Sequence, residues 1–165
     1  MNTLLRDYYG KSRLTAWQIL KNPTLFLAFG FGSGLSRYMP GTFGTIAAIP
    51  LYLALQYTDS RVYLLVTICS VLGGIYICEQ AARKLQVHDF GGIVWDEIAG
   101  LLITLTGLPY SWQMLLSGFC LFRLLDIFKP WPISWLDKNI NGGLGIMLDD
   151  VVAGLLAAGL LRIWF

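Results

Sequence analysis

Charged residues are scarce in this sequence: they make up 13% of its 165 positions, whereas hydrophobic residues make up 56%. An ordinary soluble domain has a more polar composition than this. The mean hydropathy of +0.61 agrees, because a domain this small cannot bury so many large apolar side chains within itself. We therefore expect the chain to be associated with a membrane.

Basic residues, cysteine and histidine are too few to support several other classes of site. The formal net charge is only +2, and no run of Lys and Arg alternates with aromatic residues, which argues against nucleic-acid binding. The three cysteines, Cys69, Cys78 and Cys120, lie in separate apolar stretches and are expected to act as small hydrophobic residues. The single histidine, His88, fits a surface or capping position better than that of an acid or base.

Four uncharged stretches predict helices at residues 38–58, 62–78, 98–122 and 151–161. None offers the roughly 20 uninterrupted apolar residues of a simple membrane crossing, because each is short or contains proline. Residues 98–122 cannot cross twice, so they are expected to form a hairpin bent near Pro109 or two core helices. The expected fold is all-α: a compact bundle of about six or more helices, partly embedded in the membrane.

No repeat, low-complexity tract or linker divides the chain. We expect a single catalytic helical domain over residues 25–165, preceded by a basic and aromatic segment over residues 1–24. Lys and Arg residues in that first segment and around the acidic motifs indicate that the charged face is cytoplasmic.

Two pairs of adjacent carboxylates border apolar stretches. Asp96 and Glu97 follow a helix start expected at Asp89, which would place them in the second turn, about 100° apart around the axis. Asp149 and Asp150 follow a glycine-rich loop, and one of them would cap the helix after it. The alternative is a solvated acidic rim, but a carboxylate in apolar surroundings needs a partner. Only one member of each pair is expected to face a site squarely, with Glu97 and Asp150 preferred.

A third charged motif is expected at the end of a helix. Arg123, Asp126 and Lys129 recur every three residues and share one face until Pro130 stops the helix. A local ladder of ion pairs would explain this spacing. After a long apolar stretch, however, the motif is more typical of a metal-binding carboxylate beside cations that hold phosphate oxygens.

Glycine is concentrated in residues 30–36 and 40–45, before a helix expected to begin near Ile46. Such a loop offers free backbone N–H groups, and Thr42 and Thr45 add hydroxyls, which together suit an anion. A structural turn that allows close helix approach is the alternative. The loop is not a Walker motif, because no Gly-Lys-Ser/Thr sequence closes it.

Carboxylates without a Cys/His ligand set favour Mg²⁺ or a similar hard ion over zinc. Phosphoryl transfer needs such an ion, a carboxylate near the attacking water, and cations for the phosphate charge. An ion-coupled transporter is the alternative of another class. A transport path would place carboxylates near the centres of apolar segments, whereas here they lie at the ends.

Four sequence blocks, in order, resemble the phosphatidylglycerophosphatase A family of bacterial membrane lipid phosphatases. They are residues 32–36 with 40–45, residues 93–100, residues 122–130 and residues 143–154. The resemblance implies an all-helical fold and Mg²⁺-dependent removal of the terminal phosphate of phosphatidylglycerophosphate, giving phosphatidylglycerol and inorganic phosphate. It also implies the cytoplasmic face of the bacterial inner membrane, with the lipid substrate and the membrane as partners and no obligate protein partner.

The resemblance and the motifs together assign roles to individual residues. Glu97, Asp126 and Asp150 are expected to be catalytic. The expected metal ligands, for one or two Mg²⁺ ions, are Asp96, Glu97, Asp126, Asp149 and Asp150, and the expected substrate-binding residues are Gly34, Gly41, Thr42, Thr45, Arg123 and Lys129. Direct attack by water is favoured because no Cys, Ser or His has the partners of an activated nucleophile. A phosphoaspartate at Asp126 or Asp150 is the alternative.

Overall fold

The computed structural model describes residues 15–87 and 90–164, and this part of the chain contains helices and no strand. Of the expected N-terminal segment only residues 15–24 are described, and His88 and Asp89 lie outside the described residues. The elements are α2 (Ala16–Lys21), α3 (Pro23–Ala28), the 3-10 segment η1 (Gly30–Leu35), α4 (Pro40–Leu55), α5 (Ser60–Leu85), α6 (Trp95–Leu105), α7 (Trp112–Phe128), α8 (Ile133–Asn139) and α9 (Gly142–Trp164). The expected all-α bundle is confirmed.

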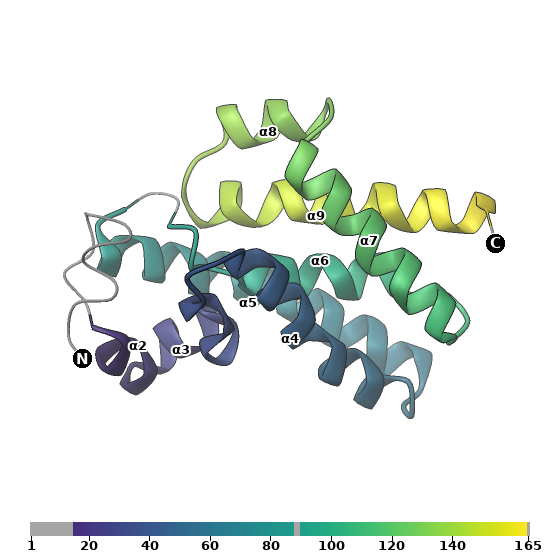
Figure 1. Cartoon of the computed structure of the whole chain (residues 1–165), viewed down its shortest axis with the longest axis horizontal. Coiled ribbons are helices and arrows are strands. Elements are labelled where there is room, and N and C mark those ends of the chain that lie inside the picture. The colour runs from purple at the N-terminus through teal and green to yellow at the C-terminus, as the bar shows by residue number, and fades with distance from the viewer. Residues whose placement is uncertain (1–14, 88–89, 165) are drawn as a thin grey trace.

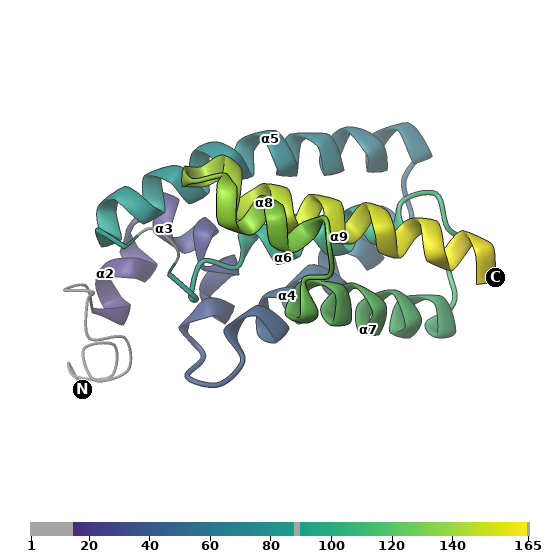
Figure 2. The ribbon, with the colours of Figure 1, turned by 90° about the horizontal axis from the view of Figure 1, so that it is seen from above.

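The two longest helices, α5 and α9, run along the long axis of the molecule (Figures 1 and 2). Helix α6 packs against α9, α5, α4 and α7, and so lies at the centre of the bundle. From Ile98 to Leu105 every residue of α6 is buried. Helix α8 folds back over the beginning of α9, while α2, α3 and η1 gather at the end of the bundle near the described N-terminus. The central helix is thereby surrounded by the elements that carry the acidic motifs.

Helices α6 and α7 form the hairpin expected around Pro109. They contact each other and are joined by residues 106–111, in which Gly107 has a φ of +67°. Ser111 caps α7 by accepting a hydrogen bond from the backbone N–H of Met114. After the turn, α7 runs back along α6. Arg123 and Asp126, near the end of α7, therefore lie close to the first turn of α6.

Three helices begin at residues other than those expected from the sequence. Helix α4 begins at Pro40, not near Ile46, because proline fits the first helical position, where no N–H is needed. Helix α6 begins at Trp95, so its acidic pair occupies the first turn and not the second. Helix α9 begins at Gly142, so Asp149 lies inside the helix, and the expected cap at this residue or at Asp150 is wrong.

Two helices are longer than their uncharged stretches suggested. Helix α5 extends to Leu85 because its charged end continues the helix, with Glu79 and Arg83 forming an ion pair one turn apart. Helices α5 and α9, with 26 and 23 residues, are long and apolar enough to cross a membrane. The expectation that no segment is long enough for a full crossing is thus wrong for these two helices.

Exposed aromatic residues lie near both ends of the apolar part of the bundle. Tyr57 follows α4, Trp112 begins α7 and Trp164 ends α9, and they are 93%, 61% and 87% exposed. Figure 1 shows these helix ends at the end of the molecule that holds the C-terminus. Trp131, just before α8, and Trp135, within it, are also exposed. Tyr and Trp are enriched where a membrane meets water. With exposed leucine and isoleucine side chains along α5 and α9 between these positions, the chain has the surface of a membrane-associated protein.

Candidate active site

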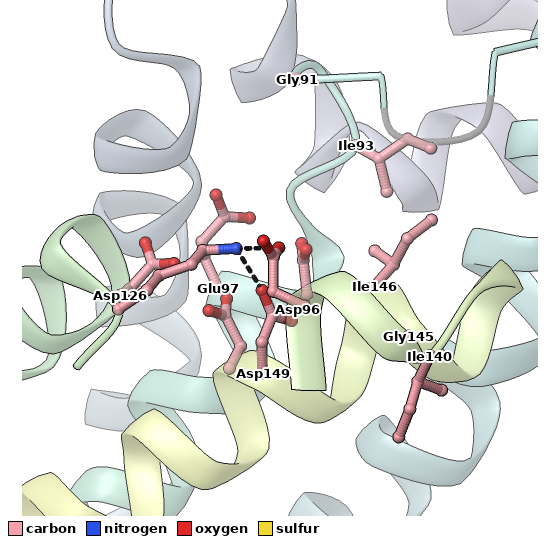
Figure 3. Close-up of a pocket in the computed structure, with 12 residues that line it drawn as sticks. Gly91, Ile93, Asp96, Glu97, Asp126, Ile140, Gly145, Ile146 and Asp149 are labelled. Carbon is pink, nitrogen blue, oxygen red and sulfur yellow. Dashed lines mark hydrogen bonds and ion pairs between the residues drawn. The ribbon is translucent and has the colours of Figure 1, made fainter. Parts of the chain in front are cut away.

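A cavity of about 190 Å³ lies where α6, α7, α8 and α9 converge (Figure 3). Five carboxylates that the sequence singled out line it: Asp96 and Glu97 of α6, Asp126 of α7, and Asp149 and Asp150 of α9. Both members of each adjacent pair face the cavity, which corrects the expectation of one from each pair. Asp96 and Glu97 reach the cavity from α6, and Asp149 and Asp150 reach it from α9.

Close contact between α6 and α9 places the two acidic pairs together. A Cβ added to Gly154 would lie 2.7 Å from the carbonyl oxygen of Gly100, and one added to Gly100 would lie 3.3 Å from the carbonyl oxygen of Asp150. Larger residues at these positions would separate the helices. The glycines therefore set the distance between the first turn of α6 and the middle of α9.

The carboxylates form two groups that share one residue. Oxygens of Asp96, Glu97 and Asp150 lie within 4.8 Å of one another, and so do oxygens of Asp126, Asp149 and Asp150. Oxygens bound to the same Mg²⁺ ion at about 2.1 Å lie up to roughly 4.2 Å apart, so small side-chain movements would suffice for binding. Asp150 thus belongs to both groups that are able to hold a metal ion.

Buried oxygens without partners also point toward a cation. One carboxylate oxygen each of Asp96, Glu97, Asp149 and Asp150 is buried and has no hydrogen-bond partner among the residues that the structure describes. A buried polar atom without a partner costs free energy, and a buried charge costs more. A hard cation bound between these oxygens would remove that cost.

Arg123 of α7 lies close to two carboxylates, Asp126 of the same helix and Glu97 of α6. Its Nη1 is 2.5 Å from Oδ2 of Asp126 and 3.8 Å from Oε1 of Glu97. All three side chains are largely buried, so solvent screens the interactions weakly. The ion pair expected between Arg123 and Asp126 is present.

Lys129 turns away from this pair, because it is the C-cap of α7 and has a left-handed backbone conformation with a φ of +41°. Its Nζ lies 2.5 Å from Oδ1 of Asp137 and 2.5 Å from Oδ2 of Asp149. The motif of residues 123, 126 and 129 therefore does not act as one helix face. Among the residues that the structure describes, six carboxylates, the five above and Asp137, meet two cations, Arg123 and Lys129, which leaves the site strongly negative when all are ionised.

Without a metal ion, the surroundings of Asp96 and Glu97 in the first turn of α6 favour the protonated form of these carboxyl groups. Burial raises the pKa of Glu97 to about 7; Asp126 also raises it, while Asp96 and Arg123 lower it. Burial and the nearby Glu97 raise the pKa of Asp96 well above its usual range. Burial alone would lower the pKa of Lys129, but its bonds to Asp137 and Asp149 raise it. The lysine is therefore charged near neutral pH.

The first turn of α4 approaches the carboxylates from another side. A Cβ added to Gly41 would lie 2.2 Å from Oε1 of Glu97 and 3.0 Å from Nη2 of Arg123. No side chain of the described residues caps α4, and its first turn supplies N–H groups from Gly41 and the half-buried Thr42. These two of the expected substrate-binding residues thus lie next to the site.

Gly34 and Thr45 lie elsewhere. A Cβ on Gly34 would lie 2.1 Å from the carbonyl oxygen of Gly92, so this glycine allows η1 to pack against the segment before α6. Thr45 is fully buried, and its hydroxyl donates a hydrogen bond to the carbonyl of Gly41. The structure gives both residues a packing role in place of the substrate contact expected from the sequence.

Sequence reasoning missed one carboxylate that lines the cavity, Asp137, and one that supports the start of α9, Glu79. Asp137 reaches Lys129 only because the chain reverses between α7 and α8, and nothing in the sequence spacing indicates that reversal. Glu79 of α5 accepts a hydrogen bond through Oε2 from the backbone N–H of Gly143. It therefore caps α9 from a neighbouring helix, 64 positions away in the sequence.

Comparisons with known proteins agree on one family. The family model described as Phosphatidylglycerophosphatase A matches residues 26–165. A protein of Escherichia coli with the name phosphatidylglycerophosphatase A is 49% identical over 152 residues, covering 92% of this chain and 86% of that protein. One of Haemophilus influenzae with the same name is 44% identical over 140 residues, covering 84% of this chain and 86% of that protein.

A further relative, from Bacteroides thetaiotaomicron, is described as a candidate phosphatidylinositol-3-phosphatase; it is 34% identical over 151 residues, covering 82% of this chain and 91% of that protein. No solved structure is significantly similar to this chain. The family matches favour an enzyme over the transporter alternative. The chain belongs to the phosphatidylglycerophosphatase A family of phosphatases.

Proposed function

We propose that this chain hydrolyses the terminal phosphate of phosphatidylglycerophosphate, giving phosphatidylglycerol and inorganic phosphate, at the cytoplasmic face of a bacterial inner membrane. Family membership supports the reaction. The observation that carries the proposal is the position of the acidic cavity, beside helices long enough to cross a membrane. A headgroup phosphate is able to enter such a cavity while the acyl chains stay in the bilayer.

Mg²⁺ is the metal ion that this site fits best in our proposal. The donors are carboxylate oxygens, which hard divalent ions prefer, and four of them are buried and unpartnered. Asp96, Glu97, Asp126, Asp149 and Asp150 would hold one or two ions. When bound, Mg²⁺ would offset the charge of the phosphate and favour deprotonation of water.

The chain's own residues would bind and orient the phosphate. In our proposal Arg123, held by Asp126 and close to Glu97, points its guanidinium at phosphate oxygens beside the first turn of α4. The N–H groups of Gly41 and Thr42 would add hydrogen bonds at that helix terminus. Lys129, which lines the cavity beside Asp149, would supply a second positive charge.

Direct attack by water completes the proposed reaction. An oxygen of water bonds to phosphorus while the bond from phosphorus to the glycerol oxygen of the lipid breaks in line. Asp126, in our proposal, accepts the proton of the attacking water at its carboxylate, the glycerol oxygen takes a proton from solvent water as it leaves, and Asp126 then releases its own proton to solvent. Hydrolysis in this form needs no covalent enzyme intermediate.

Phosphate release by the purified protein tests the proposal. Phosphatidylglycerophosphate, phosphatidylinositol-3-phosphate and a soluble phosphate ester would be compared, each with Mg²⁺ and with a chelator. We expect the first substrate with Mg²⁺ to react fastest. Faster release from the inositol lipid would instead assign the activity named for the Bacteroides relative, and equal rates with the chelator would contradict the metal dependence.

Stabilisation by Mg²⁺ is expected to increase with pH. Because burial raises the pKa of Glu97 to about 7, a proton competes with the metal ion at this carboxylate in acid. The increase in Tm caused by MgCl₂ should therefore be larger at about pH 8 than at about pH 5.5. A Tm shift independent of pH would contradict a role for Glu97 as a ligand.

Without metal the pH dependence has the opposite sign. The folded pKa of Glu97 lies above its ordinary value of 4.5, so the folded chain binds more protons than the unfolded chain between that value and about pH 7. The contribution of this group to stability is complete below the unfolded pKa and is lost as the pH rises through the folded one. The metal-free Tm should thus fall over this range, which a thermal scan at several pH values measures.

Asp137→Asn is expected to raise KM for the phosphorylated lipid by about tenfold. This is the range for a residue that positions a ligand-binding side chain, here Lys129, without touching the ligand itself. The change removes one of the two carboxylates that pair with Lys129 and leaves the other, Asp149. Steady-state kinetics would separate the KM effect from kcat. Asp137→Glu, which keeps the charge, should restore most of the affinity, and an unchanged KM in Asp137→Asn would show that this carboxylate does not position Lys129.

A further inference from the structure

A second cavity, a groove of about 310 Å³, lies between α5 and α9 and is lined almost entirely by apolar side chains. Ile103 of α6 contributes to it, and Thr106 and Arg162 lie at its end. The remaining lining residues are Leu64, Thr67, Ile68, Val71 and Leu72 of α5 and Leu155 and Ala158 of α9. Several of these side chains are exposed on the lipid-facing surface described above, so the groove opens toward the membrane.

The groove is separate from the catalytic cavity. No described residue lines both cavities. Arg162 follows Asp150 by 12 positions in the same helix, which corresponds to about 18 Å along its axis. With the acidic cavity at one face of the membrane, Arg162 lies toward the opposite face.

Arg162 is the single charged residue among those that line the groove in the described chain. Its Nη1 donates to the carbonyl of Ala158 at 2.9 Å, and its Nη2 donates to the carbonyl of Thr106 at 2.5 Å. These bonds use two of the five N–H donors of the guanidinium. The group is therefore fixed at the end of the groove, while its side chain remains exposed to an outside ligand.

We propose that the groove binds an acyl chain of an anionic phospholipid whose phosphate pairs with Arg162, in the leaflet opposite the catalytic site. The groove matches such a lipid part by part. Arg162 and Thr106 at one end suit the phosphate headgroup, and the apolar walls beyond them suit the acyl chain. Trp164, two residues after Arg162, and Trp112 are exposed at this end, where aromatic residues mark the depth of lipid headgroups. Arginine pairs closely with phosphate oxygens.

Native mass spectrometry of the full chain in micelles with equal amounts of dioleoyl phosphatidylserine and dioleoyl phosphatidylcholine tests this lipid site. Phosphatidylserine is anionic but is neither the proposed substrate nor its product. We expect it to be retained preferentially, and Arg162→Gln should lower the preference roughly two- to fivefold, as for an exposed ion pair. Arg61→Gln, an exposed cation at the same end that does not line the groove, should leave it unchanged.

Occupancy of the groove is tested by filling it. Ile68→Trp should reduce retention of both lipids, whereas Leu65→Trp, on the same helix but not lining the groove, should not. Unchanged retention in Ile68→Trp, an unchanged preference in Arg162→Gln, or a dimer that Ile68→Trp dissociates would overturn the proposal. Because the inference rests on the proposed membrane placement, phosphate release is measured separately, and Arg162→Gln should preserve it in detergent.

Discussion

Asp150→Asn is expected to lower phosphate release by about 100- to 1000-fold, the range for loss of a group that stabilises a reacting charge. Asp150 belongs to both sets of three carboxylates described above. The change to asparagine therefore removes a negatively charged oxygen ligand from both sets. Asparagine has nearly the same shape, and the backbone of α9 is unaffected. The initial rate of phosphate release with saturating Mg²⁺ measures the effect.

Thermal stability distinguishes this loss from simple misfolding. Asp150 is 3% exposed and lies close to several other carboxylates, so removing its charge should leave the Tm of the metal-free protein unchanged or raise it. The additional stabilisation by Mg²⁺ should largely disappear. A variant that retains both Mg²⁺ stabilisation and activity would remove Asp150 from the site.

Asp59→Asn is the matched control for that change. Asp59 caps α5 at the other end of the helix from Glu79, and its Oδ1 accepts a hydrogen bond from the backbone N–H of Arg61. Asparagine caps helices about as well as aspartate. Activity and Mg²⁺ stabilisation should therefore stay at the level of the unmodified chain, which separates loss of a site charge from loss of any aspartate.

Much of the fold follows from the sequence because local patterns determine helices. The four uncharged stretches correspond to five helices, α4, α5, α6, α7 and α9, and Gly107 with Pro109 marked the turn between α6 and α7. Helix boundaries were less accurate. Glycine weakens a helix only modestly, so the glycine-rich start of α9 is helical once it packs against α5, where a Cβ on Gly143 would lie 2.1 Å from the carbonyl of Ile75.

Site residues were predictable when their chemistry was unusual for their surroundings. A carboxylate next to apolar residues is costly without a partner, and this argument identified all five acidic residues that line the cavity from α6, α7 and α9. Partners that depend on chain reversal were not predictable. Lys129 and Asp137 meet because the segment between α7 and α8 turns back, and Thr45 is buried by tertiary packing alone.

Gly41→Ala is expected to reduce phosphate release by about tenfold or more, because the added Cβ would occupy the space of Glu97 and Arg123. It would lie 2.2 Å from Oε1 of Glu97, so either the carboxylate or α4 must move, and a displacement of about 1 Å at a site is able to cost 100-fold in rate. The proposed phosphate contacts at the first turn of α4 would shift with it. Phosphate release and the Mg²⁺-dependent Tm would both be measured.

Intrinsic helix propensity acts in the opposite direction and makes this prediction specific. Alanine is more favourable than glycine in a helix by about 1 kcal/mol, so a Gly41→Ala protein that loses activity while remaining folded has lost it through the contact. Gly73→Ala in α5 is the control, since no described atom lies within 4 Å of the added Cβ, and this variant should be active and at least as stable. Full activity in Gly41→Ala would instead mean that α4 moves freely and that its first turn does not position Glu97 or Arg123.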